Sequence, residues 1–260
     1  MLTDALPIWA VLVLTVAIVL AAFEVGFRLG TRRQQHAGQE PEGPLGAMVG
    51  ATLGLLAFVL AFTFSMAESR FDTRKQLVVE DAIAIRTAYE RSKFLPEPDA
   101  KEVQGRLQEY VAVRLDGARH PENFNTALAR SEELQHLLWA KAVTAAQRER
   151  DDITGLFVES VNGVIDAHVK RIAAARNRLP ITIWVSVYLM AILGLAGMGY
   201  HAGLTGAKRS LAILLMTLAF SGVLGLIADL DRPQEGLLRV SQQALIDVQR
   251  SMQETSTTSR

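Results

Sequence analysis

Very few side chains in this sequence have the types and spacing that chemistry requires. Glu133 and His136 show the Glu-x-x-His spacing of a carboxylate-bridged metal pair, but helical bundles of that kind need a second matching pair and two further glutamates. The sequence contains no second Glu-x-x-His and no cysteine. It also lacks a Ser/His/Asp order, a phosphate-binding glycine loop and a nucleotide motif. We therefore predict no enzyme activity, no metal site and no cofactor.

Two charged residues, Glu24 and Arg28, follow the first apolar stretch of the chain. Residues four apart lie on one face of a helix, so these two side chains can form an ion pair. Charges at the end of a membrane helix usually reach the interface with water. We favour an interfacial ion pair, and an intramembrane proton or ion site at Glu24 is the alternative.

Asp229, Asp231 and Arg232 form a second charged cluster, directly after the last long apolar stretch. The simpler interpretation is a stop signal that ends a membrane helix, with local ion pairing. The functional interpretation is an ion vestibule, or a contact between this cluster and Arg70 at the charged end of the second apolar stretch. These four residues are the polar candidates at the membrane interface.

Small side chains recur every three or four residues between residues 47 and 65. At 100° per residue they fall, together with Glu68 and Asp72, within a sector of roughly 80° on one helix. Such a stripe lets another backbone approach closely, because van der Waals packing replaces the hydrophobic effect in lipid. The members of this small-residue stripe are Ala47, Gly50, Gly54, Ala57, Ala61 and Ser65.

The small-residue stripe has two interpretations. In the simpler one it packs against a neighbouring helix, within one chain or between subunits. In the other, the stripe or the adjacent phenylalanines line an oligomeric pore, where the aromatic rings form an apolar constriction. The candidates for pore lining or helix packing are Gly50, Gly54, Ala57, Phe58, Ala61, Phe62 and Ser65.

The chain has four stretches without any Asp, Glu, Lys or Arg, and the residues named above, apart from Glu133 and His136, lie on these stretches or near their ends. Each is close to the roughly 20 apolar residues that a bilayer core requires, and a charge at the bilayer centre costs about 2.5–3.5 kcal/mol. The first stretch has no basic residue before it and runs directly into Glu24, so we expect a retained helix rather than a cleaved signal. The four predicted membrane helices are Pro7–Phe23, Pro44–Ala67, Leu179–Ala207 and Ser210–Ala228.

Most of the charged residues lie between Glu68 and Arg178. No proline interrupts the chain from about Leu45 to Phe94, so one helix is expected to run from the membrane into this charged segment. Three more segments with apolar residues at helical spacing follow, which predicts an antiparallel helical bundle. His168 lies on the apolar face of the last segment and is expected to be a packed core residue.

The predicted fold class is an all-α membrane protein, with four transmembrane helices in two pairs and a helical-bundle soluble domain inserted between helices two and three. The expected parts are a first transmembrane pair at 1–67, the soluble domain at 68–178 and a second pair at 179–230. A C-terminal amphipathic helix, which Ser241 caps, and a disordered tail after Gln253 complete the chain at 231–260.

Two crossings separate each soluble segment from the next, so both termini and the helical domain are expected on the same side of the membrane. The Lys and Arg residues at the domain-side flanks favour the cytoplasm for that side, although the arginines after the first helix favour the reverse. Basic and acidic residues balance at 27 each. Binding to a phosphate backbone needs a basic surplus, so we expect no nucleic-acid partner.

Several short motifs are distributed along the chain: Leu60 to Ala67, Phe71 to Arg74, Val79 to Ala82 with Thr87 to Tyr89, Leu95 to Pro98, Asp229 to Pro233 and Gly236 to Ser241. Together they resemble a bacterial membrane protein family of unknown function that carries a bestrophin-like domain. The resemblance covers nearly the whole chain. It implies a distant similarity to bestrophins, which are oligomeric anion channels with the pore neck on the second helix and a cytosolic helical domain. The sequence has no run of aspartates like the bestrophin calcium-binding segment.

The leading hypothesis is therefore a homo-oligomer of the bacterial inner membrane that conducts small ions, preferentially anions, through a passage near the second helix. Its partners would be the lipid bilayer, other copies of the chain and the conducted ions. The competing hypothesis is a non-conducting membrane scaffold or sensor whose helical domain binds a partner.

Overall fold

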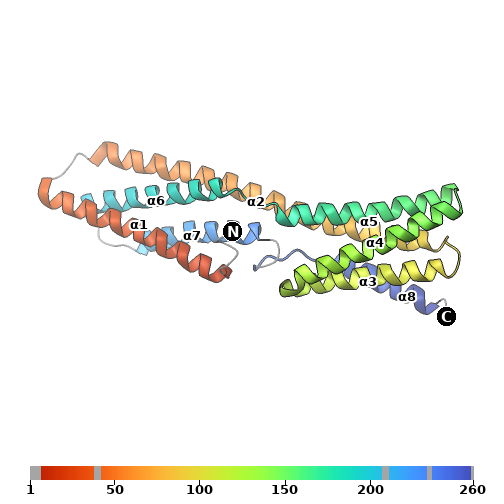
Figure 1. Cartoon of the computed structure of the whole chain (residues 1–260). Helices are drawn as coiled ribbons and strands as arrows, with labels where there is room; N and C mark the ends of the chain where they lie inside the picture. Colours follow the sequence, from red (N-terminus) through yellow and green to blue (C-terminus); the bar gives the residue numbers. More distant parts are fainter. Residues whose placement is uncertain (1–6, 38–41, 207–210, 233–235, 259–260) are drawn as a thin grey trace. The chain divides into compact units, whose positions relative to one another are not determined.

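The computed structural model describes residues 7–37, 42–206, 211–232 and 236–258. Helix makes up 89% of the structure, and the described residues contain no strand. The helices are α1 (Ile8–Ala37), α2 (Glu42–Ser92), α3 (Asp99–Arg119), α4 (Phe124–Arg148), α5 (Asp152–Arg176), α6 (Ile181–Leu204), α7 (Leu211–Asp231) and α8 (Gln243–Thr258), with a short 3₁₀ helix, η2 (Pro121–Asn123), before α4 (Figure 1).

Four stretches of these helices are long and apolar enough to cross a membrane. They are Ile8–His36, Pro44–Ser92, Asp152–Leu204 and Ile213–Asp231. The prediction of an all-α membrane protein with four transmembrane helices is therefore confirmed.

The contacts divide the chain into two compact units. Unit 1 comprises Met1–Arg70 and Arg178–Leu238, and unit 2 comprises Phe71–Asn177 and Arg239–Arg260. Helix α2 contributes its first part to unit 1 and its second part to unit 2. The division into membrane pairs and a soluble domain with boundaries at residues 67, 178 and 230 stays a prediction.

In unit 1, α1 packs against α6 and α7. The crossing of α1 and α6 depends on glycines, because their backbones approach too closely for a side chain. A Cβ added at Gly199 would overlap the carbonyl oxygen of Phe23, and one at Gly203 would overlap that of Phe27. Gly26 on α1 meets the carbonyl oxygen of Ala196 in the same way. A partly buried polar contact of 2.7 Å between Thr15 Oγ1 and Tyr188 Oη joins the same two helices.

The membrane part of α2 packs against α6 along one side. A Cβ at Gly194 of α6 would lie 3.3 Å from Leu53 Cδ2, and one at Gly197 would lie 3.6 Å from Val49 Cγ2. The buried residues continue this side along α2 at spacings of four, three and four, which is one face of a helix. They are Leu56, Leu60, Thr63 and Ala67.

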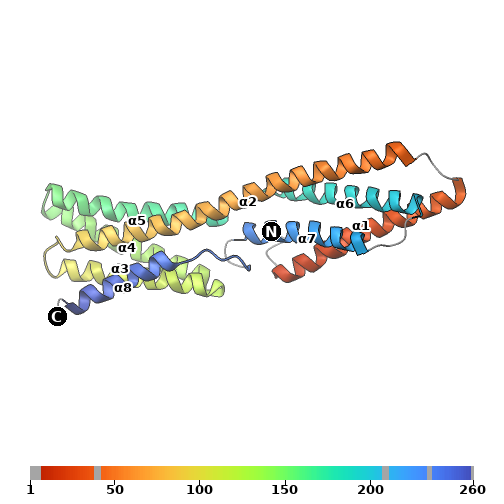
Figure 2. The same ribbon diagram turned by 180° about the vertical axis from the view of Figure 1, so that it is seen from behind.

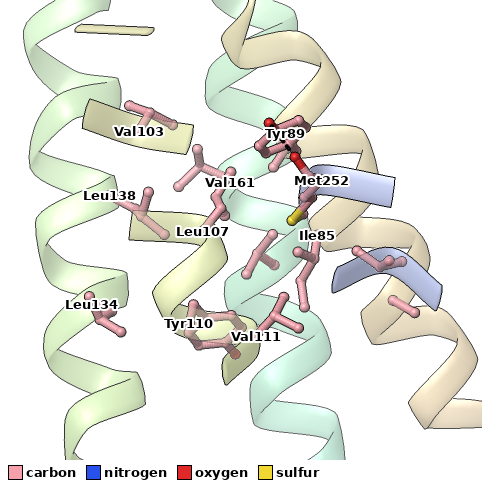
Figure 3. Packing of buried hydrophobic residues seen from close by; sticks show 14 of the residues in the cluster. Ile85, Tyr89, Val103, Leu107, Tyr110, Val111, Leu134, Leu138, Val161 and Met252 are labelled. Carbon is pink, nitrogen blue, oxygen red and sulfur yellow. Dashed lines mark hydrogen bonds between the residues drawn. The ribbon is translucent and has the colours of Figure 1, made fainter. Parts of the chain in front are cut away.

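Unit 2 has a hydrophobic core that α2, α3, α4, α5 and α8 build together. Figure 3 shows Ile85 and Tyr89 of α2 close to Leu107 of α3 and Val161 of α5. Helix α8 packs against α3 (Figure 2), and the Tyr89 hydroxyl donates to the carbonyl oxygen of Met252 over 3.3 Å. The C-terminal helix is therefore part of the bundle core. The sequence alone does not predict this role.

Helix α1 continues to Ala37, beyond the predicted membrane helix, since Thr31 to Ala37 holds no proline or glycine to stop it. At the other end, α8 extends to Thr258, where we expected disorder after Gln253. The Ser241 hydroxyl accepts a hydrogen bond of 3.3 Å from the backbone N–H of Gln243, the first residue of α8.

Candidate functional site

The small-residue stripe lies on the side of α2 that does not pack within the chain. Nothing lies within 4 Å of a Cβ added at Gly50 or at Gly54. The other members of the stripe, Ala47, Ala57, Ala61 and Ser65, are also exposed. The structure thus brings these candidates together on one open face. Packing against another helix of the same chain does not account for Gly50 and Gly54.

Two phenylalanines adjoin the small-residue stripe on the same open side of α2. Phe58 is 70% exposed and Phe62 is 62% exposed. At 100° per residue they are 40° apart on the helix, one turn from each other. The open face of α2 therefore combines a stripe of small residues with two neighbouring large aromatic rings.

Asp229, near the end of α7, folds the following segment back onto the helix. Its carboxylate oxygens accept hydrogen bonds from the backbone N–H groups of Leu237, at 2.8 Å, and Leu238, at 2.9 Å. Gly236 has a φ of +146°, and a Cβ there would overlap Asp229 Oδ1. This position therefore requires glycine. The role of Asp229 as part of a stop signal for a membrane helix stays a prediction.

Asp231 joins the end of α7 to the beginning of α6, because its Oδ1 accepts a hydrogen bond of 2.8 Å from the backbone N–H of Leu179. Asp231 and Arg232 are each 5% exposed. Arg70, the last residue of unit 1 on α2, has a buried Nη1 atom without a hydrogen-bond partner among the described residues. A contact of Arg70 with the charged cluster stays a prediction.

Unit 2 encloses a charged network that sequence reasoning did not find. Asp81 of α2 is fully buried, and its Oδ2 accepts hydrogen bonds from Arg171 of α5, at 2.6 Å, and Arg114 of α3, at 3.2 Å. Arg171 also donates to the side-chain oxygen of Gln242, just before α8, over 3.1 Å. One carboxylate therefore ties three helices together, and the two guanidinium groups leave a surplus of positive charge.

His168 and Tyr110 extend this network toward α4. The Nδ1 atom of His168 lies 3.1 Å from Arg114 Nη1 and 3.1 Å from the Tyr110 hydroxyl, and it must accept from arginine, which only donates. The Tyr110 hydroxyl accepts from Gln135 Nε2 over 3.0 Å. Burial raises the pKa of Tyr110 to about 12, because the ionised form would lose its hydration. His168 is buried, as the sequence predicts.

A sequence signal for this network exists, although it is weak. Asp81 falls between buried Val78 and Ile85 on one apolar helical face, and a charged residue on such a face is rarely buried without a partner. The glycines of the α1 and α6 crossing had a clearer signal, since Gly26 and Gly30 are four apart on α1, as GxxxG interfaces require.

The remaining charged candidates serve as ordinary ion pairs. Arg28 Nε lies 2.7 Å from Glu24 Oε1, which agrees with the expected pairing. Glu133 lies 2.6 Å from Arg130 Nη1. Within the described ranges, no group of three or more His, Asp or Glu side chains is placed to hold a metal ion.

These features define a class of protein: an all-helical membrane protein with four bilayer-crossing helices and a helical bundle that shares its second helix with the membrane unit. The chain belongs to the family of the Bestrophin-like domain, which matches residues 13–245.

Solved structures show the same fold. A crystal structure of a bacterial bestrophin homologue from Klebsiella pneumoniae, phased with zinc, is 17% identical, has a TM-score of 0.65, and aligns over 95% of this chain and 97% of that chain. A leucine-to-threonine variant of a Klebsiella pneumoniae homologue is 16% identical with a TM-score of 0.65, over 96% of this chain and 98% of that one. A comparison with curated proteins gives no match.

Proposed function

We propose that this chain assembles around α2 into a homo-oligomeric channel of the bacterial inner membrane that conducts small anions. The observation that carries the proposal is the open face of α2. Its small-residue stripe and two exposed phenylalanines lie away from the side that packs on α6. The membership in the Bestrophin-like domain family agrees with it.

The composition of this face suits another protein surface better than lipid. A glycine or alanine facing acyl chains offers little contact area, whereas the same residue lets a second helix backbone approach closely. In a symmetric ring, each copy of α2 keeps its buried side on its own α6 and turns its open side toward its neighbours or toward the central axis. A passage beside α2 would then carry rings of identical residues.

Phe58 and Phe62 are the candidates for the narrowest point of that passage. Rings of apolar side chains close a pore by excluding water rather than by blocking it physically. The stripe provides the helix contacts and the phenylalanines provide the gate. In this arrangement unit 2 and both termini would lie in the cytoplasm, which the basic residues at the domain-side flanks favour.

A non-conducting scaffold or sensor is the second candidate, and one observation favours it. Unit 2 exposes large apolar side chains that a partner protein would cover, among them Ile83 at 61% and Val169 at 58%. Apolar side chains gathered on a surface often mark interaction sites. This function requires no continuous path through the membrane and no symmetric assembly.

Chloride flux distinguishes the two functions. Purified protein reconstituted into chloride-loaded liposomes should release chloride when an ionophore removes the opposing voltage, and the mass of the protein in detergent should exceed that of one chain of 28.4 kDa. A monomer in detergent together with chloride retention equal to that of empty liposomes would contradict the channel and leave the scaffold.

A further inference from the structure

Unit 1 contains a pocket of about 420 Å³ between the start of α1, the start of α6 and the end of α7. Most of its wall is apolar, including Val11, Val185, Leu189 and Ile192. Pockets that bind small molecules span roughly 300–1,000 Å³, so this volume suits one apolar segment of an organic ligand.

One end of the pocket is charged. Arg178, Asp231 and Arg232 line it, so this end carries two guanidinium groups and one carboxylate. The carboxylate of Asp231 is engaged with the backbone N–H of Leu179 at the start of α6. Arginine stays charged at any physiological pH and recognises phosphate groups well.

The pocket runs from the expected level of the lipid head groups into the hydrocarbon core. Trp184 and Tyr188 also line it, with ring centroids 6.1 Å apart, and such aromatic side chains concentrate at the level of the head groups. From Ile181 at the start of α6 to Ile192 the helix rises about 16 Å. This length is close to half of a hydrocarbon core of about 30 Å, which is the depth of one leaflet.

One wall of the pocket is open. Ile181, Val185 and Leu189 are all more than half exposed. In a membrane, the molecules that adjoin such an apolar wall are the acyl chains of lipids. The pocket therefore has an apolar part at acyl-chain depth and a cationic part at its end.

The geometry points to a binding site for an anionic phospholipid of the surrounding bilayer, with one acyl chain along Val185 and Leu189 and the phosphate at Arg178 and Arg232. Basic pockets at the ends of transmembrane helices recognise anionic head groups. A zwitterionic phospholipid has the same chains without the net charge, so the arginines give a preference for the anionic lipid. This site does not depend on conduction and goes beyond the proposed function.

Native mass spectrometry of the full chain in detergent tests the site, with dioleoyl phosphatidylglycerol or dioleoyl phosphatidylcholine as the added lipid. The wild-type protein should retain phosphatidylglycerol about tenfold more tightly than phosphatidylcholine. Leu189→Trp fills the pocket and should weaken the retention of both lipids about tenfold. The matched control is Leu193→Trp, one turn further along α6, because Leu193 is similarly exposed but does not line the pocket. This control should bind like the wild type.

Two arginine variants test the charged end separately. Arg178→Gln should abolish the preference for phosphatidylglycerol, while both lipids keep the affinity that their acyl chains provide. Arg176 is exposed and lies outside the pocket, so Arg176→Gln should bind both lipids like the wild type. The proposal is overturned if the two lipids bind equally to the wild type, or if Leu189→Trp and Leu193→Trp behave alike. Displacement of phosphatidylglycerol by equimolar inorganic phosphate would also overturn it. So would a Leu189→Trp variant that dissociates into smaller assemblies but keeps its bound lipid.

Discussion

Arg171 donates a hydrogen bond of 2.6 Å from Nη1 to Oδ2 of Asp81, a carboxylate with no exposed surface. Arg114 donates to the same oxygen. Asp81 is thus the only acidic partner that these two arginines share among the described residues of the network, and it belongs to the helix that both units have in common. The charge balance of this buried network depends on this one side chain.

Asp81→Asn should destabilise unit 2 strongly. The substitution leaves two guanidinium groups without an anion in a buried site, and breaking a buried ion pair in this way costs about 3–5 kcal/mol. Chemical denaturation followed by circular dichroism measures the loss. Asp166→Asn is the matched control, because Asp166 is exposed on α5, and should stay within about 0.5 kcal/mol of the wild type. Equal effects of both variants would show that the network is not structural.

The stability of unit 2 should decline at alkaline pH because of Tyr110. The pKa of Tyr110 is raised by burial to about 12, so its neutral form contributes stability that is present below the unfolded pKa of about 10 and lost as the pH rises toward 12. Arg114, Arg171, Asp81 and His168 lie in the network around it. The expected loss between pH 9 and 11 is about 1 kcal/mol.

Tyr110→Phe should remove this alkaline slope, whatever its effect on stability at neutral pH. The measurement is the free energy of unfolding as a function of pH for both proteins, in which the other tyrosines are the same. Parallel curves for the two proteins from pH 9 to 11 would show that Tyr110 does not titrate differently in the folded state.

Gly199→Ala should disrupt the fold of unit 1. The added methyl group would overlap the carbonyl oxygen of Phe23, which is backbone and cannot rotate away, and overpacking of this kind costs about 1–3 kcal/mol or more. Gly222→Ala on α7 is the control, because nothing lies within 4 Å of its Cβ position. Thermal unfolding in detergent should show a lower midpoint for Gly199→Ala alone. The same midpoint for both variants would argue against the close crossing of α1 and α6.

Gly54→Leu should weaken assembly without disturbing the single chain. Gly54 and Gly222 both have open Cβ positions within the chain, so a side chain at either site starts in open space in a monomer. If the stripe is a subunit contact, only Gly54→Leu reduces the mass of the detergent-solubilised complex measured by light scattering. If both variants keep the mass of the wild-type complex, the small-residue stripe is not part of the subunit interface.

The sequence predicts the membrane helices well because their charge-free length is set by the bilayer itself. It also predicts the long helix α2, since no proline occurs between Pro44, in its first turn, and Pro96. The side of α2 that packs within the chain does not follow from the sequence. The small residues on α2 and the glycines on α6 are equally able to form a close crossing, and only the three-dimensional arrangement shows that α6 uses Gly194 and Gly197.

The other features that the sequence does not predict depend on contacts between residues far apart in the chain. Asp81, Arg114 and Arg171 are separated by tens of residues in the sequence, and the weak signal at Asp81 does not indicate its partners. Their pairing depends on the register of three helices that periodicity does not fix. The addition of α8 to the bundle is likewise a long-range contact, although its apolar residues Leu245, Val248 and Met252 mark the face that becomes buried.

The most direct test of the channel beside α2 is the unitary current of the purified protein in planar bilayers under a chloride gradient. If α2 lines an anion passage, the currents should reverse near the chloride equilibrium potential. Phe62→Leu should then change their amplitude or open probability at least about threefold, whereas Phe94→Leu, at the similarly exposed Phe94 of unit 2, should not. An absence of current across ions and voltages, or equal currents from both variants, would contradict a passage lined by α2.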